Sequence, residues 1–280
     1  MKKIFGLVVC LILASVQAEA KKRVVIVHTN DTHSQILPVA KQAFRDANRG
    51  GIARREVLLN ELRKQEKSLL LLDAGDFSQG TPFYNTFKGE VEVKMMNLLK
   101  YDAVALGNHE FDNGAEALAK ILKRARFRVL CANYDVTNSP LKGIVRPYTI
   151  IKRNGAKIGI IGVGINPDGL ISEKNFGGIV YLDPIETVNR IAAQLKESKG
   201  CDVVIVLSHL GIEYDAREQK TDDCMLAAKS RDIDVIIGGH THTFLKEIKE
   251  IKNSEGKTVY INQAGKLGLV VDKLELEWEE

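Results

Sequence analysis

The sequence predicts an α/β fold whose sheets are largely parallel and buried on both faces. Short apolar runs rich in β-branched residues alternate with amphipathic helical patterns, as in strands joined by crossover helices. The strand runs are apolar at nearly every position, which is typical of strands covered on both sides. A turn at Arg153-Asn154-Gly155 separates two further runs and predicts an antiparallel hairpin. No linker rich in Pro, Gly or Ser divides the chain, so we expect one folded domain over residues 21–280.

The first half of the chain supplies alternating strands and helices. A strand over 23–28 opens the fold, and Gly50-Gly51 precedes a helix. The apolar face of this helix is formed by Ile52, Leu58, Leu59 and Leu62. The other elements expected in this half are strands at 68–73, 102–106 and 128–131 and helices at 91–99 and 114–125.

The second half begins with the hairpin within 145–163 and continues with a helix over 184–197. The apolar residues of that helix recur at helical spacing, at Ile185, Val188, Ile191 and Leu195. The remaining expected elements are strands at 202–207, 233–237, 257–261 and 268–277 and a helix near 222–230.

Residues 1–20 are typical of a secretory signal peptide. Lys2 and Lys3 precede an uncharged apolar run over 4–16, which is too short for a membrane span, and small residues follow at Ala18 and Ala20. We therefore expect an exported protein, and the Lys-Lys start favours a bacterial periplasm. Cys10 lies inside the apolar run, so no lipid anchor is expected. A buried N-terminal helix is the alternative interpretation.

Composition excludes some classes of protein. The formal net charge of the 280 residues is only +4, which does not support a nucleic-acid polymer as partner. Beyond residue 20 the cysteines are Cys131, Cys201 and Cys224, and no CxxC spacing is present, which argues against a thiolate metal site. At most one internal disulfide is possible, and Cys201 with Cys224 is the pair we favour.

Polar residues typical of metal sites follow five of the predicted strands. In an open α/β sheet, binding sites form at the carboxyl ends of strands, so these loops are expected to meet in one crevice. Five of the six histidines lie there; His28 ends the first strand and is interpreted as structural. Imidazole and carboxylate without thiolate favour Zn, Mn, Fe or Co over Ca. The clusters are Asp31-Thr32-His33, Asp73-Ala74-Gly75-Asp76, Gly107 to Asp112, Ser208-His209 and Gly238-Gly239-His240-Thr241-His242.

Residues 26–34 and 106–112 resemble the calcineurin-like metallophosphoesterase superfamily and, within it, the 5′-nucleotidase family. Residues 75–82 and Gln263-Ala264-Gly265 strengthen the resemblance, which extends over essentially all of residues 21–280. It implies a four-layer α/β/β/α sandwich and a centre of two divalent metal ions. It also implies that the family's C-terminal substrate-binding domain is absent from this sequence.

The resemblance assigns a role to each candidate site residue. It implies that Asp76 bridges the two ions and that a dyad of His109 and Asp112 stabilises the transition state or protonates the leaving oxygen. The other ligands implied are Asp31, His33 and His242 for one ion and Asn108, His209 and His240 for the other. Glycines at 107, 238 and 239 suit tight turns and close backbone approach.

Five basic residues lie between positions 41 and 55, namely Lys41, Arg45, Arg49, Arg54 and Arg55. We interpret most of them as solvated charges on a helix face rather than as phosphate ligands. Only Arg54 or Arg55 is considered for an approach to the site.

Together these observations predict an exported, dinuclear metal-dependent phosphoesterase that hydrolyses nucleotides or related small phosphate esters. One alternative keeps the metal site but changes the substrate to cyclic nucleotides, nucleotide sugars or sulfur esters. Another is a catalytic subunit that needs a separate substrate-binding chain. A third is a binding subunit with vestigial activity, against which the complete ligand set argues.

Overall fold

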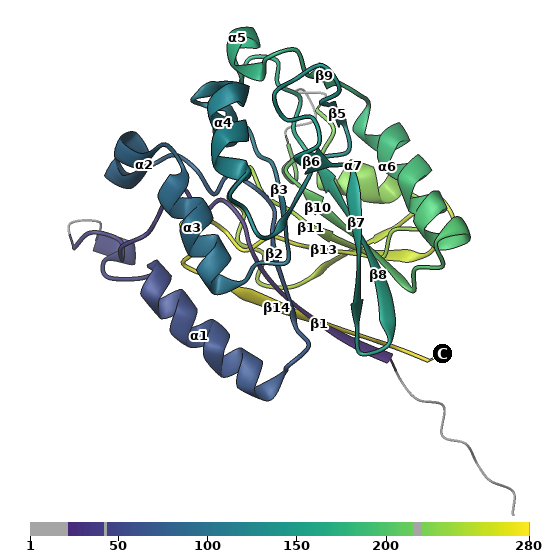
Figure 1. Cartoon of the computed structure of the whole chain (residues 1–280). Coiled ribbons are helices and arrows are strands. Elements are labelled where there is room, and N and C mark those ends of the chain that lie inside the picture. The colour runs from purple at the N-terminus through teal and green to yellow at the C-terminus, as the bar shows by residue number, and fades with distance from the viewer. Residues whose placement is uncertain (1–21, 42–43, 215–219, 280) are drawn as a thin grey trace, which may run out of the picture.

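Two six-stranded sheets lie face to face at the centre of the molecule, a computed structural model that describes residues 22–41, 44–214 and 220–279 (Figure 1). Most neighbouring strands are parallel, as predicted, and antiparallel pairs occur at the sheet margins. The first sheet has the order β14 (Asp272–Trp278), β1 (Lys22–Thr29), β2 (Leu70–Asp73), β3 (Ala103–Ala105), β4 (Arg128–Leu130) and β6 (Val145–Arg146). The second has the order β12 (Lys249–Lys252), β13 (Thr258–Asn262), β11 (Val235–Ile237), β10 (Val203–Ser208), β8 (Ala156–Val163) and β7 (Tyr148–Arg153).

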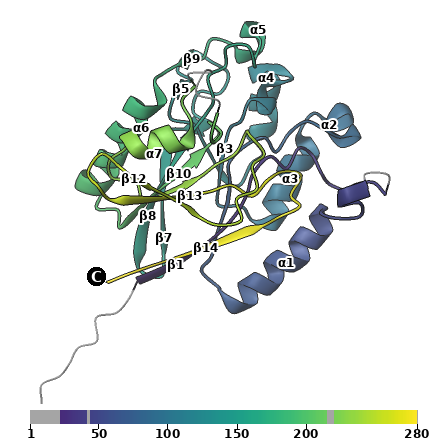
Figure 2. The same cartoon turned by 180° about the vertical axis from the view of Figure 1, so that it is seen from behind.

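Helices cover the outer face of each sheet (Figures 1 and 2). The helices α1 (Ile52–Gln65), α3 (Glu90–Leu99) and α4 (Gly114–Leu122) pack on the first sheet, and α6 (Pro184–Ala193) and α7 (Asp223–Lys229) pack on the second. Short elements fill the connections: α2 (Pro82–Phe87), α5 (Glu173–Phe176), β5 (Tyr134–Asp135), β9 (Val180–Tyr181), the 3₁₀ turns η1 (Phe44–Asp46) and η2 (His109–Phe111), and the π-helical turn η3 (Gln194–Ser198).

Three apolar cores follow from the alternation of side chains along these strands. In β1, Val24 and Ile26 lie between the two sheets, whereas Val25 and Val27 pack on the first helical layer. The strands of the second sheet divide their side chains in the same way. Because the central strands are buried on both faces, their runs are almost entirely apolar. The predicted four-layer α/β/β/α sandwich is confirmed.

Aspartates at strand starts align the parallel strands. Asp102 precedes β3 and accepts the Leu71 amide at 2.9 Å; Asp202 precedes β10 and accepts the Lys157 amide at 2.6 Å. Asp234 precedes β11 and accepts the Val204 amide at 2.7 Å. Each carboxylate anchors its strand to a neighbour at the amino end, so the carboxyl ends of these strands meet at the opposite edge of the sheets.

Several expectations differ from the structure. The predicted Cys201–Cys224 pair is wrong, since both thiols are free; Cys201 precedes β10 while Cys224 lies on α7. Arg55, one of the two basic residues considered for an approach to the site, is buried and packs against Gly268. The strand β12 was not predicted, and the last strand begins at Asp272 rather than at 268.

The predicted signal peptide lies outside the described residues. Within the part of the chain that is described, no helix has the length and apolar character needed to cross a membrane.

His28 is expected to make folding stability sensitive to mild acid. It is fully buried in β1, and its ring nitrogens have no hydrogen-bond partner among the described residues. Burial lowers its pKa to about 4, although the negative charge of Asp272 acts to raise it. The unfolded chain therefore binds this proton near pH 6.5 and the folded chain does not, so His28 lowers the free energy of unfolding as pH falls from about 6.5 to 4.

Urea unfolding of metal-free protein between pH 4 and 7.5 tests this expectation. In His28→Leu the slope of stability against pH should decrease in that window by up to about 1.4 kcal/mol per pH unit. Parallel pH profiles for the two proteins would contradict it.

Candidate metal centre

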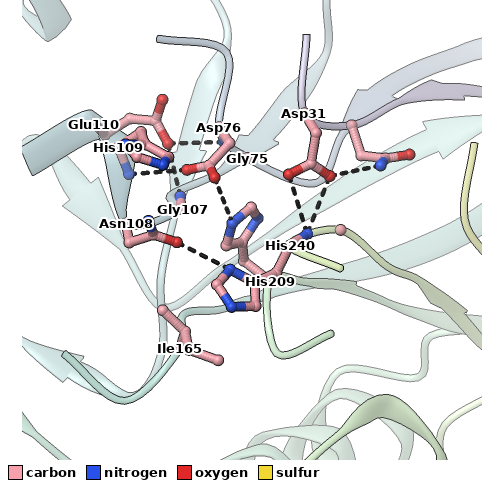
Figure 3. A network of polar contacts seen from close by, with 12 residues as sticks. Asp31, Gly75, Asp76, Gly107, Asn108, His109, Glu110, Ile165, His209 and His240 are labelled. Carbon is pink, nitrogen blue, oxygen red and sulfur yellow. Dashed lines mark hydrogen bonds and ion pairs between the residues drawn. The ribbon is translucent and has the colours of Figure 1, made fainter. Parts of the chain in front are cut away.

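The structure brings the predicted polar loops together at one edge of the two sheets. Asp31 and His33 follow β1, Asp76 follows β2, and Asn108 follows β3. His209 follows β10, and the segment with His240 and His242 follows β11. Figure 3 shows side chains from both sheets converging on Asp76 and Asp31. The predicted polar loops therefore meet at the carboxyl ends of the strands, with contributions from both halves of the chain.

One group of possible metal-binding atoms is formed by Asp31, His33 and His242. Their candidate ligand atoms all lie within 4.8 Å of one another. The Nε2 atoms of His33 and His242 are 2.9 Å apart, and His242 Nε2 is 3.4 Å from Asp31 Oδ1. Two imidazole nitrogens directed at the same point as a buried carboxylate form a donor set suited to a divalent cation.

A second group is formed by Asp76, His209 and His240, again with candidate ligand atoms within 4.8 Å. Asp76 Oδ2 lies 3.0 Å from His209 Nε2. Asn108 joins this group, since its Oδ1 is 3.0 Å from His240 Nδ1. His209 Nδ1 is 2.7 Å from the carbonyl oxygen of Ala74, which orients the ring so that Nε2 faces Asp76.

The protonation of these groups fits cation binding. Burial lowers the pKa of His33, and burial together with the nearby His209 lowers the pKa of His240 to about 4, so both imidazoles are neutral at pH 7. Burial would lower the pKa of His209, but the Asp76 carboxylate outweighs it and raises that pKa to about 10. Burial would likewise raise the pKa of Asp76, but the charge of His209 holds it well below its usual range. The site thus stabilises positive charge next to Asp76, which a divalent ion would supply.

Five of the seven candidate ligands have a left-handed backbone. Their φ angles lie between 45° and 71°, a region that residues other than glycine rarely adopt. Such conformations persist only where surrounding contacts enforce them, and they concentrate at functional sites. The residues concerned are Asp31, His33, Asp76, His240 and His242.

Glycines allow the loops to approach one another closely. A Cβ atom at Gly107 would lie 2.2 Å from Asp76 Oδ1, and one at Gly239 would lie 2.9 Å from His209 Nδ1. A side chain at either position would therefore displace candidate ligands. The close approach of neighbouring atoms, rather than an unusual φ angle, explains why glycine occupies both positions.

His109 and Asp112 stand next to the two groups. His109 Nδ1 is 3.0 Å from Asp112 Oδ2, and the ring centroid lies 5.4 Å from that of His33. The hydrogen bond to Asp112 raises the pKa of His109 against the effect of burial, and its side chain is 34% exposed. His109 thus presents a polarised imidazole to solvent beside the candidate ligands.

Other residues support the ligands and were not identified as functional from the sequence. Asn30 accepts the Ala264 amide at 2.8 Å and donates to Asp31 Oδ2 at 2.6 Å. Glu110 accepts main-chain amides from the loops after β2 and β3. Asn30 and Glu110 both lie within the motifs that carry the family resemblance, which is the signal that could have indicated them.

Comparison with known proteins gives a consistent result. Residues 24–244 match the calcineurin-like phosphoesterase family. A snake venom 5′-nucleotidase from Crotalus adamanteus is 40% identical over 231 residues, which are 79% of this chain and 37% of that protein. The crystal structure of a 5′-nucleotidase precursor from Thermus thermophilus is similar with a TM-score of 0.80 and 37% identity, covering 91% of this chain and 51% of that one.

An NAD nucleotidase from Haemophilus influenzae is also similar, with a TM-score of 0.80 and 29% identity, covering 92% of this chain and 48% of that one. The chain therefore spans about half, or less, of the length of these proteins. The family match covers most of the chain and includes every candidate ligand. The chain belongs to the calcineurin-like phosphoesterase family, and within that family its relatives include 5′-nucleotidases.

Proposed function

We propose that this chain is a dinuclear metal-dependent phosphoesterase that hydrolyses nucleoside monophosphates and related small phosphate esters. The observation that carries the proposal is the presence of two donor groups, one of which includes Asp76, beside the His109–Asp112 pair. The 5′-nucleotidases among its relatives support the nucleotide as substrate class.

In this proposal Asp76 would contact both ions, because it belongs to the second donor group and its charge also acts on His33 of the first. Asp31, His33 and His242 would hold the ion at the first group, and Asn108, His209 and His240 would hold the ion at the second. Mixed imidazole, carboxylate and amide donors suit Zn, Mn, Fe or Co.

When bound, two such ions polarise the phosphoryl oxygens and activate the attacking water. The protein supplies the rest of the chemistry. The buried carboxylates fix the positions of positive charge, and the strained loops hold the ligands in place before substrate binds. His109 donates Nδ1–H to Asp112, so its Nε2 is the atom available to the phosphoryl group or the leaving oxygen.

Base selectivity is expected to be weak. The side chains at this centre are imidazoles, carboxylates and an amide, which recognise metal ions and phosphate rather than a nucleobase. We therefore expect similar kcat/KM for adenosine and uridine monophosphates, and measurable turnover of ribose 5-phosphate. Metal-reconstituted 280-residue chain should be assayed on these substrates, with chelator-treated protein as control.

The same panel separates the alternatives. Preference for a cyclic nucleotide, NAD or a sulfur ester would change the substrate class, and metal-loaded protein inactive on every compound would contradict the proposed function. A strong preference for one base would contradict the expected weak selectivity. A separate base-binding chain predicts instead a high KM that falls when that chain is added.

We also propose that the protein is exported to a bacterial periplasm. Support comes from the signal-peptide pattern over residues 1–20. Expression of the full chain in a bacterium, followed by osmotic release and N-terminal sequencing, should yield periplasmic protein that begins at Lys21. Cytoplasmic protein that retains Met1 would contradict export.

A further inference from the structure

Glu110 stands beside the catalytic candidate His109 but faces the protein interior. It belongs to the 3₁₀ turn η2 and is 3% exposed. Its carboxylate accepts three main-chain amides: Oε2 accepts those of Asp76 at 2.9 Å and Gly107 at 2.7 Å, and Oε1 accepts that of Ser78 at 3.0 Å. Figure 3 shows Glu110 on the far side of Asp76 from His209.

These three hydrogen bonds join two loops. Asp76 and Ser78 belong to the loop after β2, and Gly107 belongs to the loop after β3. Both loops supply candidate ligands, so one buried side chain sets their separation. Losing an acceptor of this kind leaves buried amides without a partner, which is costly.

The bonds also act on the conformation of Asp76. This residue has a φ of 54°, which nearby contacts must enforce. Its Oδ1 accepts the His109 amide at 2.9 Å while its Oδ2 faces His209. Glu110 therefore fixes the main chain of Asp76. The main-chain amide of His109, the residue before Glu110, fixes the Asp76 carboxylate.

We propose that Glu110 is a positioning residue that holds the Asp76 carboxylate in the orientation that bridges two metal ions. The inference rests on the proposed function, in which Asp76 is the bridge. Glu110 is buried and belongs to neither donor group, so its effect would reach the reaction through Asp76 and Gly107. Residues that orient metal ligands in this way typically change metal affinity or activity by about 10–100-fold when they are replaced.

The test is Glu110→Gln in full-length protein reconstituted with Mn²⁺. Glutamine keeps the size of the side chain but replaces one carboxylate oxygen with an NH₂ group, which cannot accept the amides that this oxygen accepts. Two Mn²⁺ ions bridged by Asp76 should give an exchange-coupled EPR signal in the wild type. In folded Glu110→Gln we expect that signal to be lost, and at least one ion to bind about 10–100-fold more weakly. Turnover should fall through kcat more than through KM.

Asp102→Asn is the matched control. Asp102 also accepts a main-chain amide, that of Leu71 at 2.9 Å, but it lies at the amino end of β3, away from the centre. This variant should lower the melting temperature while keeping the coupled signal and wild-type Mn²⁺ affinity. Glu110→Asp keeps a carboxylate on a shorter side chain, so its Mn²⁺ affinity and coupled signal should lie between those of the wild type and Glu110→Gln. If Glu110→Gln does not fold, the same two measurements on Glu110→Asp decide the question.

The outcomes separate this inference from the proposed function. Glu110→Gln with wild-type coupling and affinity but a melting temperature lowered as in Asp102→Asn would overturn the positioning role. An uncoupled signal in the wild type would instead overturn the dinuclear centre itself. Coupled wild-type protein without hydrolytic activity would overturn the proposed function, while the spectra would still decide the role of Glu110.

Discussion

Asp76→Asn is expected to remove most of the hydrolytic activity and to reduce the bound divalent ions from two per chain to one or none. Asp76 is buried and belongs to the second donor group, with Oδ2 3.0 Å from His209 Nε2 and Oδ1 accepting the His109 amide at 2.9 Å. An amide lacks the negative charge that offsets two cations in a buried site and offers only one oxygen. The loss of activity should therefore exceed the roughly 10–100-fold that outer-shell substitutions cause.

Elemental analysis after reconstitution and dialysis measures the stoichiometry directly. Wild-type protein should hold two ions and lose activity when a chelator removes them. His242→Ala provides a matched comparison, since His242 belongs to the first donor group alone and its loss should weaken one ion only. Two ions and near wild-type turnover in Asp76→Asn would show that Asp76 is not the bridge. No more than one ion in the wild type would contradict the dinuclear centre.

The location of the centre could be predicted because two simple patterns coincide in the sequence. Strands buried on both faces are apolar throughout, so β1, β2 and β10 stand out. Parallel strands joined by crossovers share a carboxyl edge, and the metal-binding residue types follow those strands directly. Proximity of Asp31 and Asp76 therefore follows from topology alone, since they follow the neighbouring strands β1 and β2. His209 follows β10 of the second sheet, so its place depends on the layer arrangement, which needed the resemblance to a family.

The supporting contacts could not be predicted, because side-chain direction depends on packing. Glu110 is an acidic residue in a loop of candidate ligands, and nothing in its spacing indicates that it faces inward to three amides. Arg55 sits among exposed charges on α1, yet Gly268 leaves the space into which it packs. The left-handed φ angles at His240 and His242 likewise arise from contacts between loops and not from local sequence.

β12 was missed for a related reason. It runs over Lys249–Lys252 at the margin of the second sheet and alternates half-buried with exposed residues. Four residues with two lysines carry too weak a period-two signal to be distinguished from a loop. The strand forms because β13 offers an unpaired edge, which is a property of the folded sheet.

His109→Ala is expected to keep both metal ions and to lower kcat by about 10²–10⁴-fold, the range typical of a general acid or base. His109 is not a member of either donor group, and its Nδ1 is 3.0 Å from Asp112. The Ala variant removes the imidazole but leaves the main-chain amide that binds Asp76 Oδ1. Metal content by elemental analysis and single-turnover rates therefore separate the two roles, because loss of an ion would make His109 a ligand.

The leaving group then shows how His109 acts. Protonation of the leaving oxygen matters most when that oxygen is a poor leaving group, so the variant should lose more activity on adenosine monophosphate than on an aryl phosphate such as p-nitrophenyl phosphate. Equal losses on both substrates would instead assign His109 to stabilising charge on the phosphoryl oxygens. Asp112→Asn should show the same pattern with a smaller loss, because it keeps the imidazole but weakens the hydrogen bond that orients it. Wild-type turnover in both variants would show that His109 and Asp112 have no role in the reaction.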